Sequence, residues 1–393
     1  MKAPSKTEIA QPRNKVLRVL APSIYFIIII LASIYSYKRP AYNWDMLGYM
    51  ALTLKIENPD INSVHNNTYS IAEREVPNWT YYHTLADSSN AFRKRMKENP
   101  ASFNNQLAFY IIKPLYISFV YLFYKSGFSL SSSTVIPSVI SFILISILLF
   151  YWLRKYLNIF FASVLALLVM LSPPLLTVAK LSTPDALSGL ILFSSFYFII
   201  EKPKFIFAIL LMIISICTRL DNVITCILIL SLVTFAARSP IKMFSGKYAF
   251  ALALLLFCYY FVSHSTKKYG WNISFYSTFA YYLTSSSYQA VDTITLKDYS
   301  FLMYTHLLNG LYYSNITFLF LILSLLFLYP IKLNDFSFDQ LFALTLFLIF
   351  IIRFILFPDI SDRAYTAFYL TAVILLIRKI SSERSLLLKH ETV

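Results

Sequence analysis

The sequence predicts an all-helical membrane protein that crosses the bilayer many times. Hydrophobic residues make up 58% of the 393 residues and charged residues only 13%, whereas about half of a soluble domain is apolar and about a quarter is charged. Apolar runs such as "IYFIIIILASIYS", "VISFILISILLFYW" and "FALTLFLIFII" recur along the chain. Runs of this kind approach or exceed the length that a helix needs to cross about 30 Å of hydrocarbon.

About ten transmembrane helices are expected from these runs. The N-terminal segment is basic and is followed by an apolar run without a small-residue cleavage site, so we expect an uncleaved first span with a cytoplasmic N-terminus. In chain order, the predicted spans are 17–37, 134–152, 158–178, 186–200, 205–218, 223–237, 248–263, 311–330, 340–357 and 364–377.

One further segment, 106–125, is long enough to cross by hydropathy but is predicted to stay on the outer side. If it does not cross, the short cytoplasmic loops hold ten basic residues and the opposite short loops hold five; if it crosses, the bias inverts and contradicts the basic N-terminus. We therefore expect a juxtamembrane helix that dips into the membrane, with Lys113 and Pro114 in its middle. The ten are Arg154, Lys155, Lys202, Lys204, Arg238, Lys242, Lys247, Lys332, Arg378 and Lys379, and the five are Lys180, Arg219, Lys267, Lys268 and Arg363.

This topology predicts that the protein works on its outer face. The outer side carries two long loops, 38–133 and 264–310, while the cytoplasmic side has short connectors and a tail. No repeat of fixed period and no linker divides the chain, so residues 1–393 are expected to form a single membrane domain.

The composition also disfavours two classes of function. The net charge of +15 does not indicate nucleic-acid binding, because many basic residues lie in short loops where they orient the chain. The chain has only six glycines and no Gly-rich phosphate loop, so a nucleotide-driven enzyme is not expected.

Polar side chains near membrane depth are costly, and each is therefore a candidate functional residue. In the predicted topology these candidates fall on the outer side. They are Asp45, Lys113, Asp185, Arg219, Asp221, Asn222, His264, Lys267, Lys268, Arg353, Asp359, Asp362 and Arg363.

Several candidates also have a purely structural interpretation. Asp185 follows Pro184 and would cap the next helix. Arg219 and Asp221 would form an ion pair that joins two spans. Arg353 would extend toward the outer interface. The lone histidines, His83, His264 and His306, have no metal-ligand spacing, so no metal site is predicted from them.

Asp45 is harder to explain structurally. It lies between Trp44 and Met46, and its only basic neighbours in the sequence are Lys38 and Arg39. A carboxylate in apolar surroundings holds its proton more tightly, which suits a general base. Two carboxylates on separate outer turns, together with arginine and lysine, could deprotonate an attacking hydroxyl and hold a departing phosphate.

The order of these motifs resembles the GT-C superfamily of integral membrane glycosyltransferases, which use polyprenyl-phosphate-linked sugars. An acidic residue opens the first outer loop in "NWDMLGYMA", and a Pro-Leu-Tyr element follows in "IIKPLYISFVY". A second acidic residue lies in "LSPPLLTVAKLSTPDALSGLILF", a basic residue in "CTRLDN", and an arginine near an aromatic residue in "SDRAYTAFYL". The resemblance covers residues 17–237 well. It implies a catalytic module at 17–263 with the outer loop 38–133, followed by an outer loop and C-terminal helices at 264–393.

The resemblance implies a role for each motif residue. Asp45 would be the general base, and Asp185 the second acid that positions the acceptor or base. The expected substrate and phosphate ligands are Lys113, Arg219, Asp221, Arg363, Tyr49 and Tyr116. This chain has the single Asp45 where many members have paired acids, which leaves a divalent cation open; no other cofactor is expected.

The expected function is hexosyl or pentosyl transfer from a polyprenyl-phosphate sugar to a lipid-linked or cell-surface glycan or protein, in a bacterial inner membrane. A glycan polymerase or ligase is the first alternative, because the 264–310 loop holds His264 and His306. A transporter of lipid-linked glycans is the second alternative. It is disfavoured because the charges gather at one membrane rim and no repeat is visible.

Overall fold

The structure, a computed structural model, describes residues 15–236, 239–241, 245–265, 275, 278–279, 295–327 and 336–390. Within these residues all regular structure is helical. Five helices are long and apolar enough to cross a membrane, or up to eight if each bent helix pair is one span. The predicted helical, membrane-type architecture is confirmed at this level, with five to eight candidate spans where about ten were expected.

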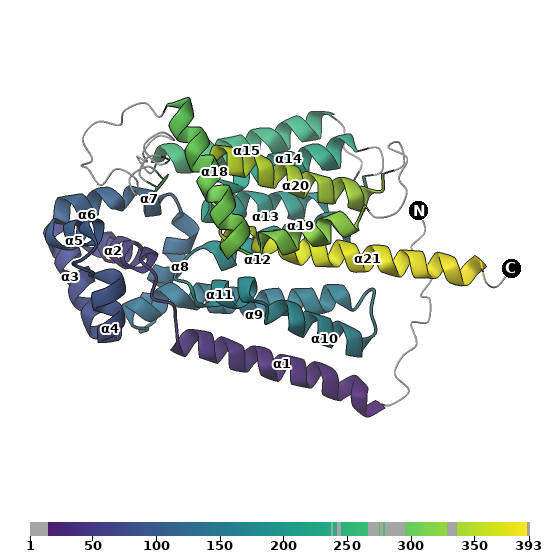
Figure 1. Cartoon of the computed structure of the whole chain (residues 1–393), viewed down its shortest axis with the longest axis horizontal. Helices are drawn as coiled ribbons and strands as arrows, with labels where there is room; N and C mark the ends of the chain where they lie inside the picture. The colour runs from purple at the N-terminus through teal and green to yellow at the C-terminus, as the bar shows by residue number, and fades with distance from the viewer. Residues whose placement is uncertain are drawn as a thin grey trace.

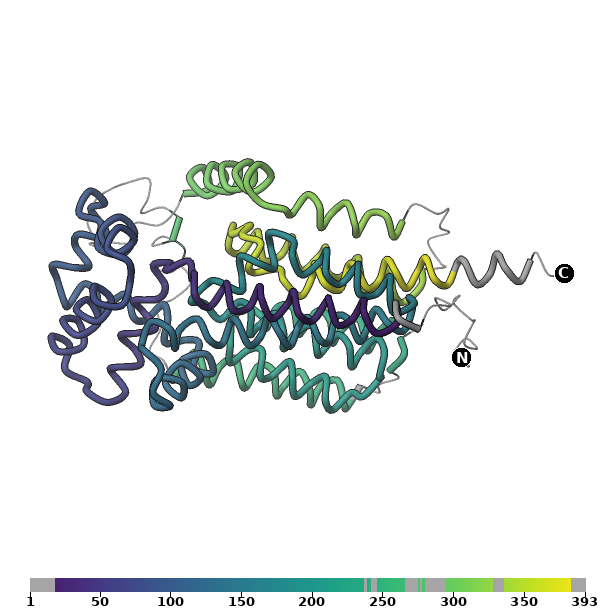
Figure 2. The backbone as a smooth tube through the Cα atoms, turned by 90° about the horizontal axis from the view of Figure 1, so that it is seen from below, coloured from purple at the N-terminus to yellow at the C-terminus, as the bar shows by residue number. Residues whose placement is uncertain are grey.

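Long helices lie side by side in a bundle, and a lobe of short helices covers one end of it (Figure 1). Figure 2 shows that α1 and α21 extend to the opposite end of the bundle. The bundle helices are α1 (Lys15–Lys38), α9 (Leu130–Leu153), α10 (Ile159–Met170), α11 (Pro173–Lys180), α12 (Asp185–Ile200), α13 (Phe205–Thr218), α14 (Asn222–Phe235), α15 (Ser245–Ser265), α19 (Ile316–Leu325), α20 (Phe338–Leu356) and α21 (Thr366–His390).

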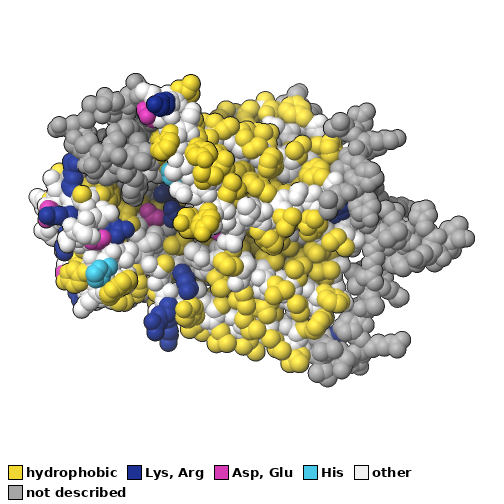
Figure 3. Space-filling view, in the orientation of Figure 1, with side chains coloured by type: hydrophobic (Ala, Val, Ile, Leu, Met, Phe, Trp, Pro, Cys, Tyr) yellow, Lys and Arg dark blue, Asp and Glu magenta, His cyan; other side chains and the backbone are white. Residues whose placement is uncertain are grey.

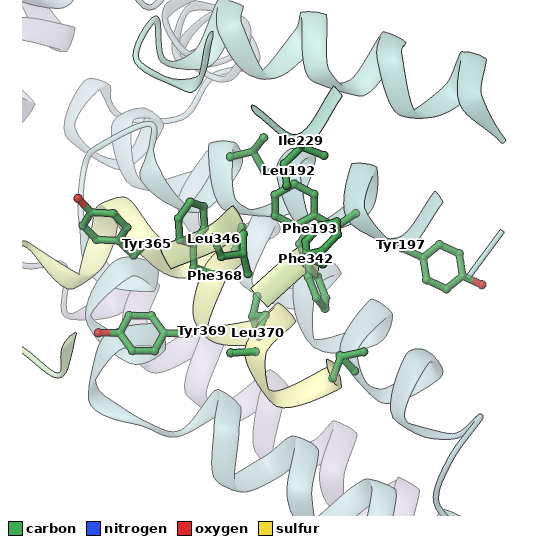
Figure 4. Packing of buried hydrophobic residues seen from close by; sticks show 14 of the residues in the cluster. Leu192, Phe193, Tyr197, Ile229, Phe342, Leu346, Tyr365, Phe368, Tyr369 and Leu370 are labelled. Atoms are coloured by element: carbon green, nitrogen blue, oxygen red, sulfur yellow. The ribbon is translucent and has the colours of Figure 1, made fainter. Parts of the chain in front are cut away.

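The bundle has a buried apolar core, and its outer surface is also apolar. Phe193, Phe342 and Phe368 meet in its interior from three different helices (Figure 4). On the outside, large apolar side chains such as Ile27 and Leu31 of α1 stay exposed, and Figure 3 shows apolar side chains over the visible side of the bundle. An apolar surface of this extent matches contact with lipid better than contact with water.

The predicted outer loop 38–133 is a folded lobe. Asp60, Asn90 and Asn99 cap three of its helices by accepting a bond from a backbone N–H three residues later. Its apolar core includes Leu187 and Ile191 of α12, so the lobe packs directly on the bundle. The lobe helices are α2 (Asp45–Glu57), α3 (Ile61–Glu75), α4 (Asn78–Thr80), η1 (Tyr81–Leu85), α5 (Ala91–Glu98), α6 (Pro100–Gln106) and α7 (Ala108–Ile111), and α8 (Pro114–Lys125) follows them.

The single helix predicted at 106–125 is wrong, because the chain breaks at Lys113. The helices before and after the break meet at an angle of 110°. Pro114 lacks a backbone N–H and starts the new helix α8, where no partner for that group is needed. Lys125, at the other end of α8, forms an ion pair with Glu57 at the end of α2. Helix α8 therefore packs against the lobe, and whether the segment 106–125 stays on one side remains a prediction.

Two other predicted spans also bend. The predicted span 158–178 turns by 61° between α10 and α11. The predicted span 311–330 starts instead in α18 (Leu296–Tyr313), which then turns by 80° into α19. Most of α18 thus lies in the predicted loop 264–310, and Lys267 and Lys268 of that loop lie outside the described residues.

Helix α12 connects two polar clusters at opposite ends of the bundle. It begins at Asp185, beside the lobe, and it is followed by Glu201. The Glu201 carboxylate lies 3.0 Å from Lys155 Nζ and 3.4 Å from Arg378 Nη1. Lys155, Glu201 and Arg378 thus gather at the end of the bundle away from the lobe. All three follow directly, or within a few residues, the predicted cytoplasmic ends of spans.

This arrangement predicts which cysteine substitutions an impermeant reagent will label from outside. Asn66 of α3 and Lys202, beside Glu201, are both exposed, so accessibility alone does not separate them. We expect Asn66→Cys to react in intact cells and Lys202→Cys to react only after the membrane is permeabilised. Labelling of Lys202→Cys in intact cells would mean that the lobe faces the cytoplasm.

Candidate functional site

A cavity of about 770 Å³ lies where the lobe meets the bundle. In Figure 3, acidic and basic side chains are visible in the hollow between these two parts. The charged residues of its lining are Asp45, Lys113, Asp185, Arg219, Asp221, Arg353, Asp359 and Arg363. Segments far apart in the sequence thus contribute charges to one cavity.

Asp45 is the first residue of α2 and is held by bonds to distant segments. Asn43 donates from Nδ2 to Asp45 Oδ2 over 3.1 Å and accepts from the backbone N–H of Ser182 over 2.9 Å. Arg363 donates from Nη1 to Asp45 Oδ2 over 3.1 Å, and Tyr110 donates to Oδ1 over 3.3 Å. The basic partner of Asp45 is therefore Arg363, 318 residues away, and not Lys38 or Arg39 beside it in the sequence. Its side chain keeps 28% exposure, which leaves it reachable from the cavity.

Asp185 is the first residue of α12 and is almost fully buried, with 3% of its side chain exposed. Arg219 Nη1 pairs with Oδ1, and Arg363 Nε lies 3.7 Å from Oδ2. No side chain caps the start of α12, so the structure does not support the helix-cap interpretation. Arg363 contacts Asp45 and Asp185 together and thereby links the two predicted catalytic carboxylates.

Asp221 lies between two guanidinium groups. Arg219 donates from Nε and Nη2 to its two oxygens over 3.0 and 2.9 Å, and Arg353 pairs with Oδ2. Burial alone would raise the pKa of Asp221, but the charges of Arg219 and Arg353 outweigh burial and hold that pKa well below its usual range. Asp221 is therefore ionised at neutral pH.

Arg353 was interpreted from sequence as a side chain that extends to the interface, and that interpretation is wrong. Only 6% of its side chain is exposed, and it lines the cavity. Its guanidinium carbon lies 5.2 Å from the centroid of the Tyr365 ring, so the cation is held against an aromatic face.

Lys113 occupies the break between α7 and α8. Its Nζ lies 5.6 Å from the Tyr49 ring centroid and 5.3 Å from the Tyr110 ring centroid. Burial lowers the pKa of the Lys113 ammonium, and the Asp45 carboxylate opposes that shift. Unlike the three arginines of the cavity, Lys113 has no carboxylate oxygen of a described residue within 4 Å.

The two predicted tyrosines lie at different depths. Tyr49 lines the cavity and is fully buried. Tyr116 packs edge-on against it, with 4.6 Å between ring centroids, and donates its hydroxyl to the carbonyl of Thr134. Tyr116 is absent from the cavity lining, so its place in the structure is to support Tyr49.

A glycine makes room for the partner of Asp45. A Cβ atom built on Gly48 would lie 2.6 Å from the Tyr110 ring. That distance is too short for any contact between carbon atoms, so only glycine allows Tyr110 to lie this close to α2. The sequence "NWDMLGYM" thus places Asp45 and the space for its hydrogen-bond donor one helical turn apart.

Sequence reasoning missed Tyr110, and it named Arg353 as a candidate without including it among the expected substrate and phosphate ligands. A lone arginine in the apolar run "IFIIRFILF" is a recognisable sign of a buried functional charge, whereas nothing near Tyr110 pointed to Asp45. Other candidates lie apart from the cavity. Asp362 accepts bonds from Asn315 and Tyr369, and neither His264 nor His306 lines the cavity.

Three of the four carboxylates in the cavity lining are paired with arginine. Asp45, Asp185 and Asp221 each contact at least one guanidinium group. Among the residues that the structure describes, no three His, Cys, Asp or Glu side chains group closely enough to hold a metal ion.

Comparison of the chain with family models, curated proteins and solved structures finds no match. The function is therefore inferred from the cavity itself.

Proposed function

We propose that the protein is a GT-C-type glycosyltransferase that moves a sugar from a polyprenyl-phosphate donor to a lipid-linked or cell-surface acceptor. One observation carries the proposal: carboxylates and cations from segments up to 318 residues apart meet in one cavity between the lobe and the apolar bundle. If the lobe faces outward, this cavity opens where a lipid-borne donor and a water-borne acceptor can meet. The enzyme would then act on the outer face of a bacterial inner membrane with about ten spans.

The lining suits an amphiphilic substrate. Beside the charged groups it contains apolar side chains of the bundle, among them Val223, Leu356 and Phe357. Such a lining can hold the first isoprene units while the charged groups fix the phosphate and sugar. The volume of about 770 Å³ lies within the range of about 300–1,000 Å³ typical of small-molecule sites.

In the proposed reaction, Asp45 accepts the proton of the acceptor hydroxyl. The hydroxyl oxygen then bonds to the anomeric carbon, and the bond from that carbon to the phosphate oxygen breaks. The polyprenyl phosphate leaves with the electron pair, and nearby cations stabilise its charge. Arg363 contacts Asp45 and Asp185, so it holds the base and the second acid in a fixed relation.

A glycan ligase or polymerase is the second candidate, and one observation favours it. Thr278, from the predicted loop 264–310, lines the cavity, so that loop reaches the site as a ligase would require. The two functions differ in the donor, which is a monosaccharide in the first and an oligosaccharide in the second.

A transfer assay with radiolabelled polyprenyl-phosphate sugars tests the proposal. Purified protein in proteoliposomes should release polyprenyl phosphate from a monosaccharide donor and move the label to an acceptor. Transfer from oligosaccharide donors alone would favour the ligase. Movement of intact donor across the bilayer, without cleavage, would replace the proposal with a transporter.

A further inference from the structure

Arg353 has an unsatisfied donor in the wall of the cavity. Its Nη1 is buried and has no hydrogen-bond partner among the described residues, while Nη2 pairs with Asp221. A buried donor of a charged group that makes no bond is costly and uncommon in a folded protein. Because the side chain lines the cavity, an anionic ligand there could supply the missing acceptor.

Arg219 is engaged differently. Its Nε and Nη2 donate to Asp221, and its Nη1 donates to Asp185. Each nitrogen of this guanidinium therefore already bonds to a carboxylate of the protein. Such an arginine holds α12, α13 and α14 together at the cavity and has less capacity left for a ligand than Arg353.

Lys113, in the same lining, also has donors to spare. Its ammonium contacts the rings of Tyr49 and Tyr110. Lys113 and Arg353 line the same cavity, and the charge of each lowers the pKa of the Asp221 carboxylate. A phosphate placed there would receive one donor from each side chain.

We propose that Arg353, together with Lys113, is the phosphate ligand of the cavity, and that Arg219 serves to position Asp185 and Asp221. This inference rests on the proposed lipid-phosphate donor and adds to it which cations hold the phosphate. A phosphate oxygen would accept from Arg353 Nη1, whose bond to Asp221 through Nη2 fixes the orientation of the guanidinium.

Binding of farnesyl phosphate and of farnesol to the detergent-solubilised full chain separates phosphate recognition from tail recognition. Arg353→Gln should weaken farnesyl phosphate binding by about ten- to hundredfold, because a bond to a charged group is lost. The same variant should bind farnesol as the wild type does. Arg154→Gln is the matched control, since Arg154 is exposed at the opposite end and its side chain bonds, among the described residues, to the carbonyl of Leu157.

A second pair of variants separates a ligand role from a structural role. Asp221→Asn should retain or strengthen farnesyl phosphate binding, because the competing charge beside Arg353 is gone. The double variant Asp221→Asn with Arg353→Gln leaves no unpaired charge between these two positions, yet it should bind farnesyl phosphate as weakly as Arg353→Gln. Recovery of wild-type affinity in the double variant would overturn the inference, as would an equal loss of farnesol binding in Arg353→Gln.

These binding measurements do not require sugar transfer, so the two proposals can fail separately. Wild-type protein that binds farnesyl phosphate through Arg353 but transfers no sugar would overturn the glycosyltransferase and leave the phosphate site in place. Sugar transfer with normal farnesyl phosphate binding in Arg353→Gln would overturn the phosphate site alone.

Discussion

Replacing Asp45 with Asn should lower kcat for sugar transfer by about 10²- to 10⁴-fold, the usual contribution of a general base. Asparagine keeps the size of the side chain and can still accept from Arg363 and Tyr110, but it cannot take up the proton of the acceptor hydroxyl. Donor binding should change little. Steady-state kinetics and donor affinity, measured on the same preparation, give both quantities.

Two further carboxylates serve as comparisons for Asp45. Asp60→Asn, in the same lobe, should leave turnover unchanged, because the Asp60 side chain accepts a bond from the backbone of Ser63 and Asn caps a helix as well as Asp does. Asp185→Asn should have a smaller effect than Asp45→Asn if Asp185 positions the substrate. Near-normal turnover by well-folded Asp45→Asn would remove the proposed base and with it the proposed mechanism.

Arg219→Ala should destabilise the protein and raise the apparent KM for the donor. The change leaves Asp185, with 3% of its side chain exposed, only the more distant contact to Arg363 at 3.7 Å. Removing one partner of a buried ion pair typically costs about 3–5 kcal/mol. We expect about 3 kcal/mol, because Asp185 and Asp221 each keep one other arginine.

Arg219→Lys should show smaller effects than Arg219→Ala in both measurements. Lysine retains the charge but loses the planar fork that reaches two carboxylates at once. Thermal unfolding in detergent and the KM for the donor measure the two effects, with Arg154→Ala as the control for loss of an exposed arginine. If Arg219→Ala unfolded at the same temperature as the wild type, Arg219 would not join the helices around the cavity.

Hydropathy predicted where most helices lie, because the free energy of placing a segment in a membrane depends on the composition of that segment alone. The bends at Lys113, between α10 and α11, and between α18 and α19 were not predicted as such. Prolines mark two of the three bends, Pro114 at the first and Pro173 with Pro174 at the second. Helix α18 was assigned to a loop because its residues, such as Lys297 and Asp298, make it less apolar than the spans.

For the site, individual charged residues could be predicted from sequence, but their contacts with one another could not. Asp45, Asp185 and Arg219 could be selected from sequence, since charged groups near apolar runs are rare and costly. Their pairing could not be selected, because Asp45 and Arg363 are 318 residues apart and come together only through packing of the lobe on the bundle. Sequence spacing also could not show that Arg353 lies inside the cavity, since an arginine near a helix end can equally extend to the interface.

The lipid that co-purifies with the protein from its own membrane provides the most direct measurement. Mass spectrometry should detect a polyprenyl phosphate, or its sugar conjugate, enriched over its share of the membrane lipids. The enrichment should fall in the variant that carries both Lys113→Gln and Arg353→Gln. Recovery of bulk phospholipids alone, in the proportions of the membrane and equally in wild type and variant, would contradict a cavity built for a polyprenyl-phosphate donor.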